Sequence, residues 1–430
     1  MDGIARPPVT GDLGGVLWRT TRMAFPSPPA PVPATPAWDL AGYRRQFPVC
    51  DRVVYLNHAA VSPIATPTRV AMQALLTDVE EWGAVHWQQW AEEQDGARAT
   101  LARFIGAHAD EIALLKNTSE GLSTVALGLD WQPGDRVVAM GSEFPSNVYP
   151  WLALRDRGVA VQLLREGPQG IDLDQLAHAC RGARLLAVSF VQYLSGFRLD
   201  LQRVGDICRR TGTLLVVDAI QGLGAFPLDV KQAGIHALAA DGHKWLTGPE
   251  GAALLYLDRD LLSQVTPREI GWTSVAAGED FDVLARLERG ENPLTWRASA
   301  ARFEAGTLNT VGFRGLHAAV SLLAEVGGAT IATRILGLTE RLVQGLLEQG
   351  CTILGPRGTP ASASPTGDAR SGIVSFRSPR LAARSLHRWL QRAEIHCAER
   401  GGWLRVAPHF YNSEEEIDRL LDQLKGAPGD

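Results

Sequence analysis

The sequence predicts an α/β fold, with a large domain built on a mostly parallel sheet and a smaller α+β domain after it. Between residues 110 and 257, short and nearly continuous apolar runs alternate with helical patterns. Strands that are buried on both faces and separated by helices are typical of parallel sheets. From about residue 325 longer amphipathic helices alternate with isolated strand-like runs. A chain of 430 residues is long enough for two or three compact units.

The large domain is predicted from its strands. The apolar runs that we interpret as strands span residues 112–115, 136–140, 159–164, 185–190, 214–217 and 252–257. We interpret three segments as helices: one that begins near Ser119, one that continues through Trp151, and one over residues 201–210. Right-handed crossovers would bring the carboxyl ends of the parallel strands, and with them a ligand site, to one edge of the sheet.

The smaller domain is predicted from a long helix over residues 329–349, a strand at 372–376, a helix at 381–393 and a strand at 403–407. A last helix follows Ser413, because Glu416 stands three residues later in a capping-box pattern. Residues 1–37 are rich in proline, which lacks a backbone N–H, and are expected to form a disordered arm. The large domain is then expected at 38–325 and the small domain at 326–430.

Composition excludes several classes of protein. The net charge of −5 comes without a basic block, so nucleic acid is not an expected partner. No apolar run reaches the roughly 18–20 residues that span a bilayer, so a membrane is not expected either. Five scattered cysteines without a C-x-x-C pair favour neither a disulfide framework nor a zinc site. We therefore expect no metal and a reducing, cytoplasmic location.

The segment Ala-Asp-Gly-His-Lys-Trp-Leu-Thr-Gly-Pro-Glu-Gly at residues 240–251 is the strongest chemical signal. It sets Lys244 among small and turn-forming residues, directly before a strand. Such a lysine suggests a Schiff base with pyridoxal 5'-phosphate (PLP), a cofactor that supplies an electron sink. The alternative is a solvated lysine in a Gly/Pro-rich turn.

Other residues could complete a PLP site. Asp218 ends a strand and could pair with the pyridine nitrogen, or it could only cap that strand. Gln221 could donate to the phenolic oxygen of the cofactor. Thr118 and Ser119 lie between a strand and a helix, where backbone N–H groups favour a phosphate, although any helix N-cap has the same pattern.

Two more side chains have an alternative structural role. Phe144 follows the strand at 136–140 and could stack on the cofactor, or it could be a buried loop aromatic. His243 precedes Lys244 and could contact the phosphate, or it could make a structural hydrogen bond.

Four motifs resemble the class V aminotransferase family, which includes cysteine desulfurases, selenocysteine lyases, kynureninases and isopenicillin N epimerase-like proteins. They are Asp218-x-x-Gln221, His243-Lys244-Trp245-Leu246-x-Gly248-Pro249, Arg302-Phe303-Glu304-Ala305-Gly306-Thr307-x-Asn309 and Arg405-Val406-Ala407-Pro408-His409-Phe410-Tyr411-Asn412. The resemblance runs from about Tyr55 to the C-terminal helix. It implies the PLP-dependent transferase fold of type I.

The resemblance also implies roles for individual residues. Lys244 would hold PLP, Asp218 would bind its pyridine nitrogen, and Gln221 would bind its phenolic oxygen. Phe144 would stack on the ring. The phosphate would be bound by Thr118, Ser119 and His243. Gly306 and Thr307 would reach the phosphate of a neighbouring subunit, which implies a homodimer with shared sites. Arg405 would bind the α-carboxylate of an amino acid substrate, with Asn57 and His58 also in the substrate site. Tyr193 stands where many desulfurases carry an asparagine.

The sequence identifies the cofactor more closely than it identifies the reaction. Lys244, once freed, would take the α-proton of an amino acid. A desulfurase also needs a thiolate on a mobile loop. Cys397 is the only cysteine in the corresponding region, and it precedes Arg405 by so few residues that we interpret it as structural. We therefore predict a C–S lyase that acts by β-elimination, or a desulfurase-like enzyme, with epimerisation and transamination as alternatives and an inactive binding protein as a further one.

Overall fold

The computed structural model describes residues 39–167, 170–278, 280–355 and 368–428. The expected proline-rich arm at 1–37 lies outside these residues. The described residues from Leu40 onward form one compact unit. Among the described residues no single helix is long and apolar enough to cross a membrane, although two consecutive helices bent by 81° pass that test together.

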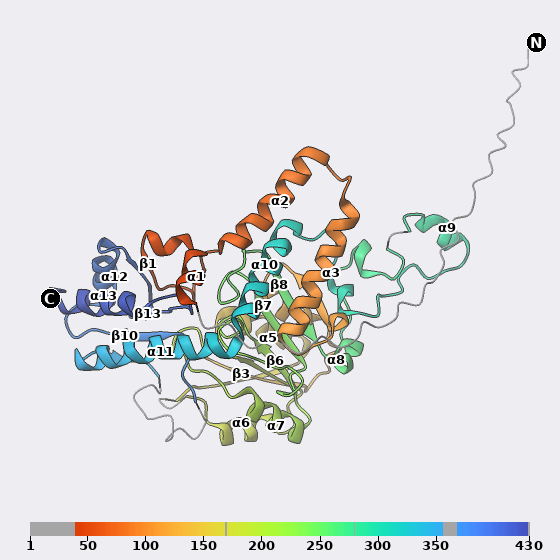
Figure 1. Ribbon diagram of the computed structural model, residues 1–430. Coiled ribbons are helices and arrows are strands. Elements are labelled where there is room, and N and C mark those ends of the chain that lie inside the picture. The colour runs from red at the N-terminus through yellow and green to blue at the C-terminus, as the bar shows by residue number, and fades with distance from the viewer. Residues whose placement is uncertain (1–38, 168–169, 279, 356–367, 429–430) are drawn as a thin grey trace, which may run out of the picture. The chain divides into compact units, whose positions relative to one another are not determined.

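A seven-stranded sheet forms the centre of the large domain (Figure 1). Its strands are β2 (Ile112–Leu115), β3 (Arg136–Met140), β4 (Ala160–Leu164), β5 (Leu185–Ser189), β6 (Leu214–Asp218), β7 (Ala237–Asp241) and β8 (Ala253–Leu257). They lie in the order β2-β8-β7-β6-β5-β3-β4, and only β8 runs antiparallel to its neighbours. The predicted α/β class with a mostly parallel sheet is therefore confirmed.

Helices cover both faces of this sheet because successive residues of each strand point to opposite faces. Leu186 and Val188 of β5 belong to one apolar cluster, and Leu185 and Ala187 belong to the other. The first cluster includes side chains from α6 (Leu173–Cys180), α7 (Leu201–Thr211), α10 (Thr310–Val326) and α11 (Gly328–Glu348). The second includes side chains from α4 (Thr118–Gly128), α5 (Tyr149–Leu152) and α8 (Arg259–Gln264).

The predicted helix through Trp151 is broken into three pieces. A 3-10 helix spans Pro145–Asn147, α5 covers Tyr149–Leu152, and a second 3-10 helix spans Ala153–Arg157. Pro145 and Pro150 cannot donate to a helical ladder, which explains why one regular helix does not form.

The smaller sheet follows the large one in sequence. It contains β9 (Thr352–Ile353), β10 (Val374–Arg377), β12 (Ala398–Arg400) and β13 (Trp403–Val406) in the order β12-β13-β10-β9. One face packs on α12 (Ala383–Arg392), α13 (Glu414–Lys425) and the second half of α11. The predicted capping box of Ser413 and Glu416 is present at the start of α13.

The N-terminal segment contacts the C-terminal end of the chain. After α1 (Leu40–Arg45) and a 3-10 helix (Pro48–Asp51), β1 (Val54–Tyr55) pairs in parallel with β11 (Ile395–His396). Arg44 forms an ion pair of 3.0 Å with Glu416, and the ring of Phe47 stacks on Tyr411 at 3.7 Å. The segment also packs on the large domain, because Phe47 belongs to the apolar cluster of the large sheet and Tyr43 donates to Glu325 at 3.3 Å.

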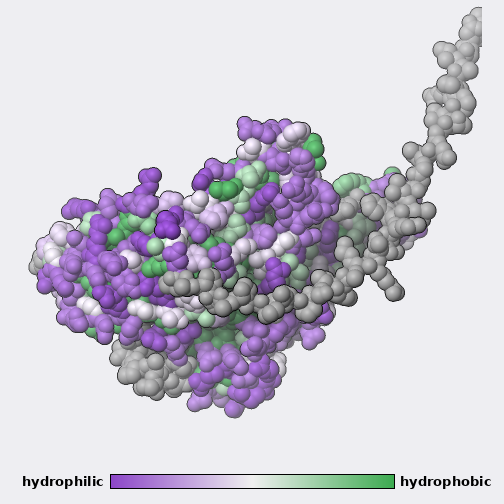
Figure 2. Space-filling view, in the orientation of Figure 1, coloured by the Kyte–Doolittle hydropathy of each residue, from purple (hydrophilic) through white to green (hydrophobic). Residues whose placement is uncertain are grey.

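Two long helices, α2 (Thr66–Trp82) and α3 (Trp87–Phe104), pack against α10 and form a projecting hairpin (Figure 1). At its far end the side chains of Val79, Trp82 and Val85 are exposed. Figure 2 shows hydrophobic residues at this end on an otherwise mostly hydrophilic face. The remaining elements are α9 (Val283–Glu288) and short 3-10 helices at Ala109–Glu111, Trp272–Ser274 and Ala300–Phe303.

A buried ion pair anchors the loop before α10. The carboxylate of Glu304 accepts hydrogen bonds from Arg98 and from the backbone N–H of Leu114, the latter at 2.7 Å. We expect Glu304→Ala to lower the free energy of unfolding by about 3–5 kcal/mol, because it removes the buried partner of the Arg98 guanidinium and leaves only the exposed Asp95 at 3.5 Å. Urea unfolding measures this effect. Asp418→Ala, which removes an exposed ion pair with Arg341, is the control and should change the midpoint little.

Candidate active site

The candidate site lies at the edge of the large sheet where strands β2, β3, β5, β6 and β7 all end. These strands are mutually parallel, because β8 is antiparallel to both β2 and β7. Thr118 follows β2, Phe144 follows β3, Asp218 ends β6 and Lys244 follows β7. The topology thus gathers residues from distant parts of the chain, as expected for a ligand site in an α/β fold.

Lys244 and Asp218 form the centre of the site. Burial lowers the pKa of Lys244 to about 8, against the opposing charge of Asp218. Burial also raises the pKa of Asp218 to about 6, although the N–H of Ile220, at 3.0 Å, and the charge of Lys244 favour the carboxylate. Near neutral pH the site therefore holds a carboxylate beside an ammonium group that loses its proton, and becomes nucleophilic, far more easily than an ordinary lysine.

The start of α4 offers donors to an anion. Asn117 caps the helix, and Thr118 is buried with its hydroxyl accepting the N–H of Asp241 at 3.0 Å. The hydroxyls of Ser119 and Ser146 lie 2.7 Å apart. Because the first N–H groups of a helix have no helical partner, this terminus favours a phosphate. His243 lies near it, with Nδ1 at 3.1 Å from the carboxylate of Asp241.

Two aromatic rings flank the lysine. The centroid of the Phe144 ring lies 5.8 Å from Lys244 Nζ, and Phe144 is 46% exposed, so a face of the ring remains open to a ligand. Tyr193 contacts Phe144 edge-on, with centroids 5.5 Å apart. Phe144 is therefore not the buried loop aromatic of the alternative interpretation.

The side-chain amide of Gln221 makes hydrogen bonds within the protein through both its oxygen and its nitrogen. Its Oε1 accepts from Trp245 Nε1 at 2.9 Å, and its Nε2 donates to the carbonyl of Ala59 at 2.9 Å. One Nε2 hydrogen remains for a cofactor oxygen. The main contribution of Gln221 in this structure is to hold Trp245, the neighbour of Lys244.

His58 is corrected by the structure. It is fully buried, with Nδ1 at 2.7 Å from the carbonyl of Ala407 and Nε2 at 2.5 Å from the hydroxyl of Tyr411. Both ring nitrogens are occupied, so His58 has none left for a substrate. It connects the N-terminal segment to the residues after β13. Burial lowers its pKa, which keeps the ring neutral.

Arg405 is buried on β13, and its Nη1 donates to the carbonyl of Tyr193 at 2.8 Å. Two buried polar atoms near this edge, Asn57 Oδ1 and Arg405 Nε, have no hydrogen-bond partner among the described residues. Asn57 forms a parallel β-bridge with Ala407, two residues after Arg405, which brings Asn57 to the end of β13. Such unpartnered groups are costly unless a ligand satisfies them, so the residues fit a polar cofactor with its substrate.

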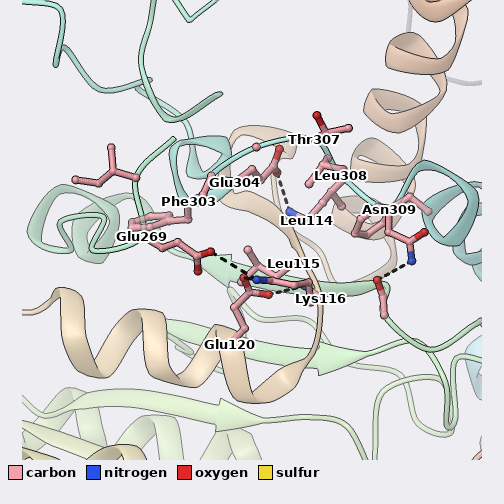
Figure 3. A pocket seen from close by; sticks show the side chains of 15 residues that line it. Leu114, Leu115, Lys116, Glu120, Glu269, Phe303, Glu304, Thr307, Leu308 and Asn309 are labelled. Atoms are coloured by element: carbon pink, nitrogen blue, oxygen red, sulfur yellow. Dashed lines mark hydrogen bonds and ion pairs between the residues drawn. The ribbon is translucent and has the colours of Figure 1, made fainter. Parts of the chain in front are cut away.

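Gly306 and Thr307 line a different cavity, of about 430 Å³, whose lining does not include Lys244 (Figure 3). Lys116 spans this cavity between Glu120 and Glu269, at 3.2 and 3.6 Å. Within one chain, therefore, the structure does not bring Gly306 and Thr307 together with Lys244.

Sequence patterns miss one carboxyl group beside the site. Glu143 is buried, accepts the N–H of Ser189 at 2.7 Å and also contacts the Ser189 hydroxyl. Ser189 is the register partner of Asp218 across β5 and β6. Burial raises the pKa of Glu143 to about 8, and the charge of Asp218 adds to the effect. Its position directly before Phe144 is the only sequence signal.

Cys397 lies in the small-domain core, 5% exposed. Burial raises the pKa of its thiol to about 12. A thiol that is buried and protonated is a structural residue, as the sequence spacing predicts. Of the other cysteines, Cys180, Cys208 and Cys351 are also buried, and Cys50 is partly buried.

Comparison with known proteins agrees with this geometry. A family model described as aminotransferase class-V matches residues 54–420. A probable cysteine desulfurase of Pyrococcus abyssi is 31% identical over 89% of this chain and 96% of its own. The apo structure of a cysteine desulfurase from Thermococcus onnurineus superposes with a TM-score of 0.80 at 28% identity, covering 90% of this chain and 98% of its own. The structure of the cystine C–S lyase C-DES, in complex with its product cysteine persulfide, superposes with a TM-score of 0.79 at 26% identity. The match covers 89% of this chain and 100% of the C-DES chain.

Fold and comparisons together define a PLP-dependent enzyme of fold type I. The matched region includes both sheets and every predicted site residue. The chain belongs to the aminotransferase class-V family.

The pKa of Lys244 predicts how the apoprotein takes up PLP. The neutral amine attacks the aldehyde, so the rate should rise with pH and reach half its maximum near pH 8 rather than near the ordinary lysine value of 10.5. Below about pH 6 binding should weaken further, because Asp218 becomes protonated. Stopped-flow absorbance of the bound cofactor measures both effects. A midpoint near 10 would contradict the pKa assigned to Lys244.

Proposed function

We propose that this enzyme is a C–S lyase that cleaves the Cβ–S bond of a cysteine-type amino acid by β-elimination. The observation that carries the proposal is the position of Cys397, whose thiol lies in the small-domain core and not beside Lys244. Sulfur transfer to a protein thiolate needs an accessible cysteine, and none of the five is exposed. The likeness to the cystine C–S lyase supports the same proposal.

The proposed roles follow from the site. Lys244 would hold PLP, which supplies an electron sink at Cα when bound, and Asp218 would keep the pyridine nitrogen protonated. Gln221 would reach the phenolic oxygen, and Phe144 would cover the ring. The phosphate would be bound by Thr118, Ser119 and His243.

Arg405 would hold the substrate α-carboxylate, with Asn57 beside it, while Lys244 takes the α-proton. The sulfur then leaves with the electron pair of the Cβ–S bond. Overall, an S-substituted cysteine and water give pyruvate, ammonium and a thiol.

Product analysis distinguishes this reaction from the alternatives. Purified holoenzyme with S-substituted cysteines in deuterated water should release pyruvate and thiol in equal amounts. Recovered substrate that carries deuterium at Cα and has lost its chirality, without pyruvate, would show epimerisation instead. Alanine with sulfur bound to the protein would show desulfurase chemistry. Lys244→Ala is the control for non-enzymatic release.

We also propose that the enzyme is a homodimer with shared active sites. Gly306 and Thr307 line a cavity apart from Lys244, as expected if they serve a neighbouring subunit. Apolar side chains are exposed at the end of the α2–α3 hairpin and on α9, including Trp82, Leu284 and Leu287. Exposed patches of this kind mark protein interfaces. Light scattering should give twice the chain mass of 46.4 kDa, and a monomer that retains activity would contradict the shared site.

A cytoplasmic location is proposed from the cysteines. All five are free in the structure, which is the state expected in a reducing compartment.

A further inference from the structure

The hairpin of β12 and β13 presents two arginines on one face. Gly401 and Gly402 form its turn, with φ angles of +57° and +78° that favour glycine. Ala398 pairs with Arg405, and Arg400 pairs with Trp403. Because alternate residues share a face of a strand, Arg400 lies on the same face as Arg405. Leu404 points the other way, into the small-domain core.

Neither arginine has an acidic partner among the described residues. Arg405 is 3% exposed, and among the described residues its guanidinium donates to the carbonyl of Tyr193, while Nε has no partner. Arg400 is exposed and contacts only the carbonyl of Glu399, at 3.3 Å. Its place on the same face of the hairpin as Arg405 puts it on the side of the active site. Its charge also lowers the pKa of Arg405, after the larger effect of burial, and contributes less to the lowered pKa of Lys244 than the charge of Arg405 does.

Three cationic groups, Arg400, Arg405 and Lys244, are thus held together with Asp218 as the main opposing charge. Like charges in proximity destabilise each other, and the energy is recovered when an anion binds. A substrate α-carboxylate satisfies one guanidinium, the buried one. The exposed guanidinium belongs to the same face of the hairpin, next to its turn, and is left for a second anionic group.

We infer that Arg400 binds a second acidic group, carried on the sulfur side of the substrate, while Arg405 binds the α-carboxylate. The inference rests on the proposed function and narrows its substrate class to cysteine derivatives whose sulfur substituent is anionic. A guanidinium at the rim suits a carboxylate or sulfonate, since its planar fork donates two parallel hydrogen bonds.

A matched pair of substrates tests the inference. S-sulfo-L-cysteine carries an anionic sulfur substituent, and S-methylthio-L-cysteine carries a neutral one. Arg400→Ala should raise KM for the anionic substrate about tenfold, in the lower part of the range for a charged hydrogen bond, and leave the neutral substrate unchanged. Arg400→Lys should retain part of the preference. Arg392→Ala, on the exposed end of α12, is the control. Equal losses with both substrates, or none with either, would overturn the inference.

Binding without turnover separates this inference from the proposed reaction. L-glutamate and L-norvaline have no sulfur leaving group, and they differ in side-chain charge. Their affinity is read from the change in the visible spectrum of the bound cofactor. The wild type should prefer L-glutamate about tenfold, and Arg400→Ala should remove the preference. If the wild type prefers L-glutamate to L-norvaline but releases no pyruvate from any substrate, only the proposed lyase reaction is refuted. Pyruvate release with no preference would refute only the second anion site.

Discussion

Replacing Lys244 with alanine is expected to abolish the yellow colour of the purified enzyme and to lower its activity by at least about 10²–10⁴-fold. The loss combines two functions, because the same amine holds the cofactor and moves the α-proton. Its depressed pKa of about 8 makes it suited to both. Absorbance of the protein after reconstitution with PLP measures the first function, and pyruvate release measures the second.

A second lysine provides the control. Lys425 is 63% exposed on its side chain and pairs with Asp422, so Lys425→Ala should keep both colour and activity. Circular dichroism of both variants checks that the fold is retained. A Lys244→Ala protein that stays yellow under the same conditions would remove Lys244 from the cofactor site.

Replacing Arg405 with alanine is expected to raise KM for the amino acid by about 10- to 100-fold, the range for hydrogen bonds to a charged group. The effect should fall on KM more than on the colour, because Arg405 is proposed to contact the substrate and not PLP. Substrate-dependent spectral changes measure the affinity directly.

The conservative variant sharpens this prediction. Arg405→Lys keeps the charge but not the planar fork, so it should recover only part of the affinity. Arg392→Ala removes an exposed arginine at the end of α12 and serves as the control. An unchanged KM in Arg405→Ala would mean that the α-carboxylate binds elsewhere.

Much of the fold could be predicted because buried parallel strands form continuous apolar runs. The strands at 112–115 and 136–140 have the predicted bounds, and β5 and β8 differ by one residue at one end. Strand β7 was not predicted, since its sequence Ala-Leu-Ala-Ala-Asp favours a helix by propensity and becomes a strand only between β6 and β8.

The site was predictable where chemistry follows a strand end. Asp218 and Lys244 meet because the topology brings the ends of β6 and β7 together. His58 could not be assigned from sequence, since its two partners stand 349 and 353 residues away and fill both nitrogens. Arg400 and Glu143 look like ordinary surface charges in the sequence. Only register and burial show that they border the site.

The pairing of β1 with β11 determines the order in which the active site assembles during synthesis. Val54 leaves the ribosome roughly 340 residues before its partner Ile395, a delay on the order of tens of seconds during synthesis. Over that interval the large sheet can form with Lys244 already in place, while Asn57 lacks the strand that carries Arg405. A nascent or truncated chain should therefore take up the cofactor before it can bind an amino acid, and it remains inactive until Ile395 and the strand that carries Arg405 have emerged.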